Sequence, residues 1–101
     1  MLIEAILERR SDPRFSVALD AQLRRSGRHA ERVMVSSVST RGCAITPTRS
    51  VSEGEYVWIR FSGLEARAAN VVWIEAERAG LKFIEPLHSA VVDQLSLTGG
   101  G

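Results

Sequence analysis

The segment FSVALDAQL, residues 15–23, decides the fold class of this chain. Apolar side chains occupy every odd-numbered position in it: Phe15, Val17, Leu19, Ala21 and Leu23. Because successive side chains of a β-strand point to opposite faces, this period of two predicts a strand with one buried face. It is the clearest strand signal in the sequence.

The residues after this strand predict a β-hairpin. RRSGRH at 24–29 is a polar turn with a central glycine, and a second strand (AERVMVSSV) is expected at about 30–38. A turn centred on residue 27 pairs positions whose numbers sum to about 54, twice 27. The first residue of the first strand, Phe15, is therefore expected beside the end of the second, at Val38.

Four further strands are expected along the chain. They cover GCAIT (42–46), EYVWIRF (55–61), EARAANVVWIEA (65–76) and AGLKFIE (79–85). Pro47 stops the first of these, and the glycines at 54, 63 and 80 predict turns. Six short strands of this kind predict an all-β fold, a small antiparallel barrel or sandwich.

The two ends of the chain lack the strand pattern. Residues 1–14 predict a short N-terminal helix or arm, residues 15–96 the domain itself, and residues 97–101 a flexible tail. Pro86 suits the first turn of a C-terminal helix. Apolar residues after it recur at helical spacing: Leu87, Val91, Val92 and Leu95.

Composition narrows the classes of function. A length of 101 residues, with 45% apolar and 25% charged residues, is typical of one globular domain. The only cysteine, Cys43, is expected to be buried, and the two histidines are far apart in the sequence. No nucleophile–base pair, metal site or cofactor site follows from these residues, so we expect no enzymatic activity. The sequence lacks a signal peptide or membrane-spanning pattern, which favours the cytoplasm.

Arginine is concentrated in the N-terminal half of the chain. Residues 1–50 contain nine bases and five acids (+4), whereas residues 51–101 contain four bases and seven acids (−3). This asymmetry indicates an anionic partner for the N-terminal half. A genome rich in G and C would also explain the number of arginines.

Three of these arginines lie in RRSDPRF (9–15), directly before the first strand. The hairpin brings them beside SSVSTRG (36–42), where alternation places Ser37 and Ser39 on the same face as Val35. Arginine forks that face hydroxyls and backbone N–H groups suit phosphates and the hydrogen-bonding edge of guanine.

At these residues the chain resembles the PilZ domain family. The family's signature is RxxxR before the first strand, followed by [D/N]xSxxG at the turn after the second. Arg10 and Arg14 match the first part completely, with Arg9 as an adjacent basic residue. Ser39 and Gly42 match the second part. The similarity continues through VVWIEAERAGLKF near the end of the chain.

This resemblance covers about residues 9–96 and implies a six-stranded antiparallel PilZ-like β-barrel that binds the second messenger cyclic di-GMP. It implies an effector protein as a further partner, no DNA or RNA, and no membrane insertion. The arginines would clamp phosphate and guanine, the serines would meet the base edge, and binding would reorient the N-terminal arm. The implied ligand-binding residues are Arg9, Arg10, Arg14, Ser37, Ser39 and Gly42.

Ser37 departs from the family pattern, because it stands where the family has Asp or Asn. Replacing a charged acceptor by a neutral hydroxyl costs about 1 to 1.5 kcal/mol, which weakens binding on the order of tenfold. An alternative therefore stays open: a degenerate PilZ-like adaptor that acts through protein contacts without nucleotide. A general nucleic-acid-binding barrel is disfavoured, because Trp58 and Trp73 are expected in the core or barrel wall rather than exposed among the basic residues.

Overall fold

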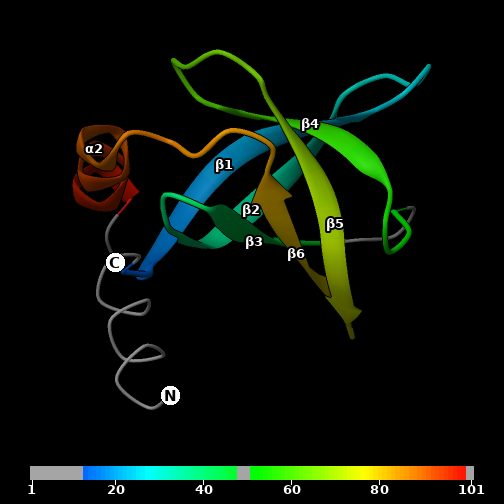
Figure 1. Ribbon diagram of the computed structural model, residues 1–101, viewed down its shortest axis with the longest axis horizontal. Coiled ribbons are helices and arrows are strands. Elements are labelled where there is room, and N and C mark those ends of the chain that lie inside the picture. Colours follow the sequence, from blue (N-terminus) through cyan, green and yellow to red (C-terminus); the bar gives the residue numbers. More distant parts are fainter. Residues whose placement is uncertain (1–12, 48–50, 100–101) are drawn as a thin grey trace.

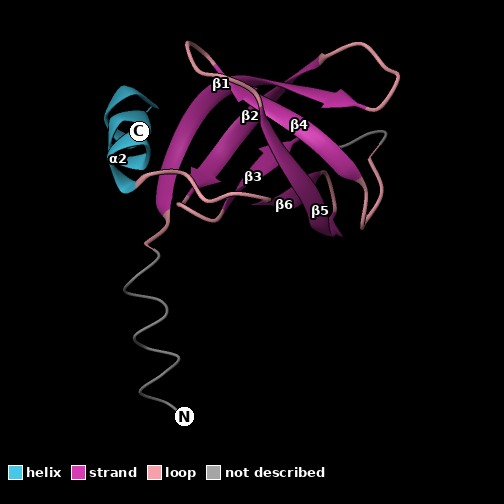
Figure 2. Cartoon of the chain, turned by 45° about the horizontal axis from the view of Figure 1, so that its top comes forward, coloured by secondary structure: helices cyan, strands magenta, loops and turns pink. Residues whose placement is uncertain are grey.

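The computed structural model describes residues 13–47 and 51–99. Within them the chain forms six strands followed by one helix (Figures 1 and 2). These elements are β1 (Phe15–Arg25), β2 (Glu31–Val38), β3 (Gly42–Thr46), β4 (Tyr56–Phe61), β5 (Arg67–Glu75), β6 (Arg78–Phe83) and α2 (Ser89–Gly99).

The six strands form a closed barrel in the order β1-β2-β3-β6-β5-β4, and every neighbouring pair is antiparallel. The pairing of β1 with β4 closes the ring, with Leu23 opposite Ile59. The prediction of a six-stranded antiparallel barrel with a C-terminal helix is therefore confirmed, and closure selects the barrel over the sandwich.

The first hairpin has the predicted register. Leu23 lies opposite Glu31, so the paired numbers sum to 54 beside the turn, and Phe15 lies opposite Val38, where they sum to 53. The difference comes from a bulge between these two points, which puts one extra residue into the ladder. The start of β1 thus lies beside the end of β2.

The barrel interior is filled by the apolar residues of the alternating pattern. Fully buried residues from four strands make up its centre: Val35, Val38, Ile45, Val57, Ile59, Phe61 and Val71. The helix α2 lies outside the barrel against β1 (Figure 2), where Val92 and Leu95 are buried. Gly99 also contacts this strand, since a Cβ there would lie 2.1 Å from a methyl carbon of Leu19.

The helix boundaries differ from the prediction at both ends. Pro86 does not form the first turn, because the backbone N–H of Leu87 donates to the carbonyl of Thr40 (2.8 Å). The helix begins instead after His88, whose ring Nδ1 accepts the backbone N–H of Ala90 (3.0 Å) in the manner of an N-cap. At its other end α2 continues to Gly99, so residues 97–99, predicted to belong to a tail, are helical.

Gly80 was expected in a turn but lies within β6. The turn between β5 and β6 is formed instead by Ala76 and Glu77, and Ala76 takes a left-handed conformation with φ of 56°. The expected strands at 65–76 and 79–85 already leave a turn between them, but a non-glycine residue at positive φ is uncommon, so its start at Ala76 carries no residue signal.

Candidate functional site

The candidate site is built around the start of β1. Phe15 pairs with Val38, so Arg14 lies next to the turn that connects β2 and β3. Arg14 is exposed and lines a hollow of about 200 Å³ together with Ser39 and Gly42 of that turn. The fold therefore brings the second arginine of RxxxR to the serine and glycine of the later motif.

Ser39 holds the turn in place through its own backbone and side chain. Its hydroxyl oxygen accepts the backbone N–H groups of Arg41 (3.2 Å) and Gly42 (3.3 Å), and its backbone N–H donates to the Gly42 carbonyl (2.9 Å). The residue is 2% exposed. Ser39 is therefore a turn residue that shapes the wall of the hollow, with both lone pairs of its hydroxyl directed at backbone donors.

Gly42 allows two strands to approach closely. A Cβ at this position would lie 2.0 Å from the backbone carbonyl oxygen of Leu81, in β6, which no other residue type could accommodate without moving a strand. The sequence predicted that Gly42 permits a turn or a close approach. The structure assigns it the close approach, across the β3–β6 pair.

Ser37 is not on the face that alternation predicts. In the β2–β3 ladder Val35 pairs with Ile45 but Ser37 pairs with Ala44, so Ser36 is an extra residue in a bulge. The bulge reverses the alternation, which turns Val38 inward and Ser37 to the outer surface, half-buried. The prediction that Ser37 shares the face of Val35 is therefore wrong.

A second bulge places Trp73 on the outer surface. Strand β5 pairs Val71 with Leu81 but Trp73 with Gly80, so Val72 is the extra residue there. A Cβ on Gly80 would lie 2.1 Å from the Nε1 atom of Trp73, which shows that the indole ring lies directly on the backbone of β6. The guanidinium of Arg78 is 5.7 Å from the centre of the same ring.

A row of paired residues crosses the outer side of the barrel from Ser37 to Trp73. Ser37 pairs with Ala44, Ala44 pairs with Gly80, and Gly80 pairs with Trp73, so these four residues form one row across four strands. The two inner residues of the row are buried, Ala44 completely and Gly80 against the indole of Trp73. Trp73 lines the hollow that Arg14 and Ser39 also line.

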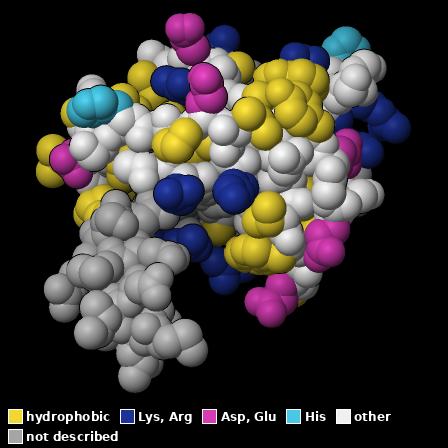
Figure 3. Space-filling model, viewed as in Figure 1, with side chains coloured by type: hydrophobic (Ala, Val, Ile, Leu, Met, Phe, Trp, Pro, Cys, Tyr) yellow, Lys and Arg dark blue, Asp and Glu magenta, His cyan; other side chains and the backbone are white. Residues whose placement is uncertain are grey.

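The hollow, called here the β3–β6 hollow, is basic. Its lining includes three cationic side chains, Arg14, Arg41 and Lys82, and no carboxylate among the residues that the structure describes. Basic side chains gather around a recess on the face that carries β3 and β6 (Figure 3). Such a surface attracts anions, and the guanidinium groups of its arginines can form paired hydrogen bonds to phosphate oxygens.

A family model for the PilZ domain matches residues 8–97 of this chain. The chain belongs to the PilZ domain family. Among solved structures, the inhibitor of motility MotI/DgrA of Bacillus subtilis is similar, with a TM-score of 0.64 and 20% sequence identity. The match covers 90% of this chain and 49% of that one, so this PilZ domain spans about half the length of the B. subtilis chain. At this identity the similarity shows a shared fold. No curated protein matches significantly.

The PilZ signature is only partly within the described residues. Arg9 and Arg10 lie outside them, so the structure places Arg14 alone of the three arginines. It brings Arg14, Ser39 and Gly42 together at the hollow and leaves Ser37 on the neighbouring outer surface of β2.

Among the residues that line the hollow of this PilZ domain, Arg41, Trp73, Gly80 and Lys82 were not predicted as site residues from the sequence. Alternation from Val71 predicts that Trp73 lies inside the barrel, and no residue within β5 itself marks the bulge that turns it outward. The signal that could have found it is the glycine at position 80, because a glycine in a strand marks a bulge or a close approach.

Cys43 lies beside the hollow but faces the barrel interior. Burial raises the pKa of its thiol to about 12, although the charge of Arg14 acts to lower it. The thiol is therefore neutral near pH 7 and packs as a small apolar group, as the sequence predicted.

Two searches of the described residues give negative results. Across 13–47 and 51–99, no group of three or more His, Cys, Asp or Glu side chains is arranged to hold a metal ion. The helix in the described part of the chain is too short and too polar to cross a membrane.

Proposed function

We propose that this PilZ domain binds cyclic di-GMP at the β3–β6 hollow. The observation that carries the proposal is the meeting of Arg14 with the Ser39–Gly42 turn, the two parts of the family's signature, at a basic hollow. Cyclic di-GMP is an anion with two phosphates and two guanines, so the site must supply cations and a surface for a planar base.

The side chains around the hollow can supply both. Arg14, Arg41 and Lys82 are exposed cations that can approach phosphate oxygens from three sides. Trp73 is half-buried against Gly80, so its ring is held in place and can contact a base without losing much conformational freedom. The bonded turn at Ser39 fixes the wall against which the ligand would lie.

The hollow is too small to enclose the whole nucleotide. Its volume is about 200 Å³, whereas pockets that bury a drug-sized ligand usually have roughly 300 to 1,000 Å³. In the proposed complex the remaining surface of the ligand is covered by the N-terminal arm, with Arg9 and Arg10 on the guanine and phosphate. Closure of the arm over the nucleotide is the step that relays binding to an effector.

Calorimetric titration tests the proposal. We expect cyclic di-GMP to bind with micromolar or tighter affinity, and linear pGpG or cyclic di-AMP to bind much more weakly. Equal affinity for the adenine analogue would contradict guanine recognition, and no heat with cyclic di-GMP would contradict the receptor function. Limited proteolysis tests the relay, because cleavage within residues 1–14 should be suppressed at saturating ligand.

One observation favours the second candidate, an adaptor that works without nucleotide. Ser37 offers a hydroxyl where the family has a carboxylate or amide, and it does not line the hollow. If neither wild type nor Ser37→Asp binds cyclic di-GMP, the adaptor function replaces the receptor function. Both candidates keep the cytoplasm as the predicted compartment and an effector protein as the predicted partner.

A further inference from the structure

A second surface of the barrel has the chemistry of a docking site. Alternation along β4 sends Val57, Ile59 and Phe61 into the core, where they are fully buried, and leaves the other positions on the outside. We call this surface the β1–β4 face and define it by five outward residues of these two strands: Gln22, Arg24, Tyr56, Trp58 and Arg60.

The aromatic residues of the face form a compact cluster with an arginine. Arg24 pairs with Trp58 across the β1–β4 ladder, and its guanidinium carbon lies 4.3 Å from the centre of the indole. Tyr56 meets the same ring edge-on, with centroids 5.1 Å apart and planes at 81°. Trp58 is half-buried, whereas Tyr56 is 46% exposed, so the cluster is held by its neighbours but open to a partner.

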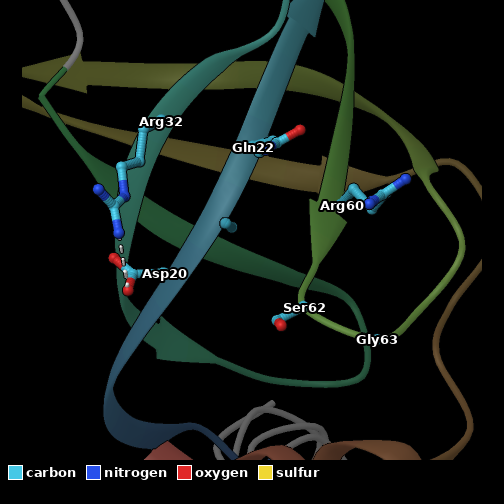
Figure 4. Close-up of a pocket in the computed structure, with 7 residues that line it drawn as sticks. Asp20, Gln22, Arg32, Arg60, Ser62 and Gly63 are labelled. Atoms are coloured by element: carbon cyan, nitrogen blue, oxygen red, sulfur yellow. Dashed lines mark ion pairs between the residues drawn. The ribbon is translucent and has the colours of Figure 1, made fainter.

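A groove continues the face toward one end of β1 (Figure 4). It has a volume of about 460 Å³ and is lined by polar residues of β1, β2 and β4. Figure 4 shows Arg32 turned toward Asp20 on one side of Gln22 and Arg60 on the other. The groove is wide enough to accept side chains from another molecule.

The charges of the face are not balanced within the domain. Asp20 is paired with Arg32 (3.5 Å), but Arg24 and Arg60 have no carboxylate within ion-pair distance among the described residues. Two exposed guanidinium groups thus flank a tryptophan and a tyrosine, with nothing of opposite charge assigned to them. Arg, Trp and Tyr are also the residue types that contribute most to protein–protein binding energy.

The β1–β4 face lies on the wall opposite the β3–β6 hollow. In the ring order, β1 is three strands from β6 and β4 is three strands from β3, in either direction. A partner on one wall therefore leaves the other wall accessible.

We propose that the β1–β4 face docks an acidic segment of a protein partner. Carboxylates of the segment would pair with Arg24 and Arg60, and an apolar side chain between them would pack against Trp58 and Tyr56. The inference does not depend on nucleotide binding, since it uses no residue of the β3–β6 hollow.

Single-stranded nucleic acid is the competing occupant, and the ring geometry favours the protein. Successive bases stack on open aromatic faces. Here one face of Trp58 carries Arg24, and Tyr56 stands at 81° to it, so the pair does not offer two parallel platforms. A carboxylate of a protein partner can pair with the edge of the Arg24 guanidinium, which stacking over Trp58 does not cover.

The test selects binders from a phage-displayed library of random twelve-residue peptides on the immobilised full chain. We expect the selected peptides to be rich in Asp and Glu around one or two apolar residues, and the synthetic peptides to bind at least tenfold more weakly to Arg24→Glu. A peptide in which Lys replaces the critical acid should regain binding to Arg24→Glu. This charge reversal distinguishes a direct ion pair from general loss of positive charge.

Arg78→Glu is the matched control, because Arg78 also lies over a tryptophan but outside the face. It should bind the acidic peptides like wild type, and Arg24→Glu should stay folded, because its exposed side chain makes one contact with Trp58 that is worth about 0.5 to 1 kcal/mol. Selection of peptides without an acidic bias, or equal losses in both variants, would overturn the proposal. So would tight binding of a twelve-nucleotide oligo(dT) that depends on Arg24, or a dimer of the chain that Trp58→Ala dissociates.

Discussion

Trp58 and Trp73 both lie on the outer surface of the barrel with an arginine over the ring, yet the sequence places them there by different means. Trp58 follows the alternation of β4, between the buried Val57 and Ile59. Trp73 would face the core by the same rule, and only the bulge at Val72 turns it outward. The sequence predicted both tryptophans in the core or barrel wall, whereas both lie on its outer surface with an arginine near the ring. Strict alternation places Trp58 outside but would turn Trp73 inward.

The two surroundings differ as well. The indole of Trp73 packs against Gly80, which has no side chain, beside the cations of the β3–β6 hollow. Trp58 sits under Arg24 on an open face beside a wide groove. The first ring lies among cations that suit an anionic ligand, and the second lies beside a groove that suits side chains of a partner. The predictions below compare the two walls, in order of decreasing effect.

Arg14→Ala should abolish measurable binding of cyclic di-GMP, because it removes the one arginine of the signature that the structure places at the hollow. Arg24→Ala on the opposite wall is the control and should leave the affinity unchanged. Titration calorimetry measures both, and thermal melts should show both variants folded, with Arg24→Ala the less stable by about 0.5 to 1 kcal/mol because it loses its contact with Trp58. Equal losses of affinity would mean that the two walls do not act separately.

Gly80→Ala should destabilise the domain by about 1 to 3 kcal/mol, because the new methyl group would overlap the indole of Trp73. The same substitution in a Trp73→Ala background should cost much less, since the clash is gone. Denaturant unfolding of the four proteins gives the interaction energy as a double-mutant cycle. Additive effects would show that the ring does not lie on Gly80.

Ser37→Asp should raise the affinity for cyclic di-GMP roughly tenfold, if the outward position found here lets the carboxylate reach guanine. Ser37→Ala should weaken binding only a few-fold. The outer surface of β2 should tolerate either change, so melting temperatures should stay close to wild type. An Asp variant no better than wild type, with wild type inactive, would favour the adaptor function.

The two arginine–tryptophan contacts should differ in strength. Arg24 lies 4.3 Å from its ring centre and Arg78 lies 5.7 Å from its own. Exposed cation–π contacts contribute about 0.5 to 1 kcal/mol, so Arg24→Ala should cost more stability than Arg78→Ala within that range. Urea unfolding monitored by indole fluorescence measures both, and the reverse order would contradict the geometry.

The smallest effect concerns Arg25, which unlike its neighbour Arg24 has a carboxylate partner. Its Nε lies 2.5 Å from Glu55, and this hydrogen bond lowers the pKa of that carboxyl below its ordinary value. The pair therefore stabilises the fold above the unfolded pKa of Glu, about 4.3, and the contribution is lost as the pH falls below it. A surface pair is worth about 0.2 to 1 kcal/mol. Glu55→Gln should therefore lower the free energy of unfolding at pH 7 by that amount and leave it nearly unchanged in acid, which denaturant unfolding at the two pH values measures.

The sequence was sufficient for the first hairpin, because the alternation of β1 and the central glycine of its turn set the register. The strand pattern alone left barrel and sandwich open, and the resemblance to the PilZ family selected the barrel. The sequence also placed Arg14 beside Ser39, since pairing follows from the turn. It failed where the backbone departs from regular pairing: at the bulge that turns Ser37 outward, at the bulge that turns Trp73 outward, and at the Ala76 turn. A bulge adds one residue without a required residue type, so its position depends on packing between strands that are distant in sequence.

The start of the helix shows the same limitation. Pro86 by itself favours the first turn of a helix. The backbone N–H of Leu87, however, donates to the carbonyl of Thr40, and the helix begins only after His88. A competing hydrogen bond from another part of the fold outweighed a local preference.

Closure of the six-stranded ring has a consequence for how such a domain can change over time. Every strand has a neighbour on both sides, so the ring has no edge strand, although β1 pairs with β4 only from Ala21 onward. Recognition then depends on outward side chains alone, which can be replaced without disturbing the pairing that holds the barrel together. Substitutions on one wall, such as a change at position 37, can remove or restore ligand binding there without altering the residues that contact a partner on the opposite wall. In such a ring, the binding specificities of opposite walls are free to evolve separately.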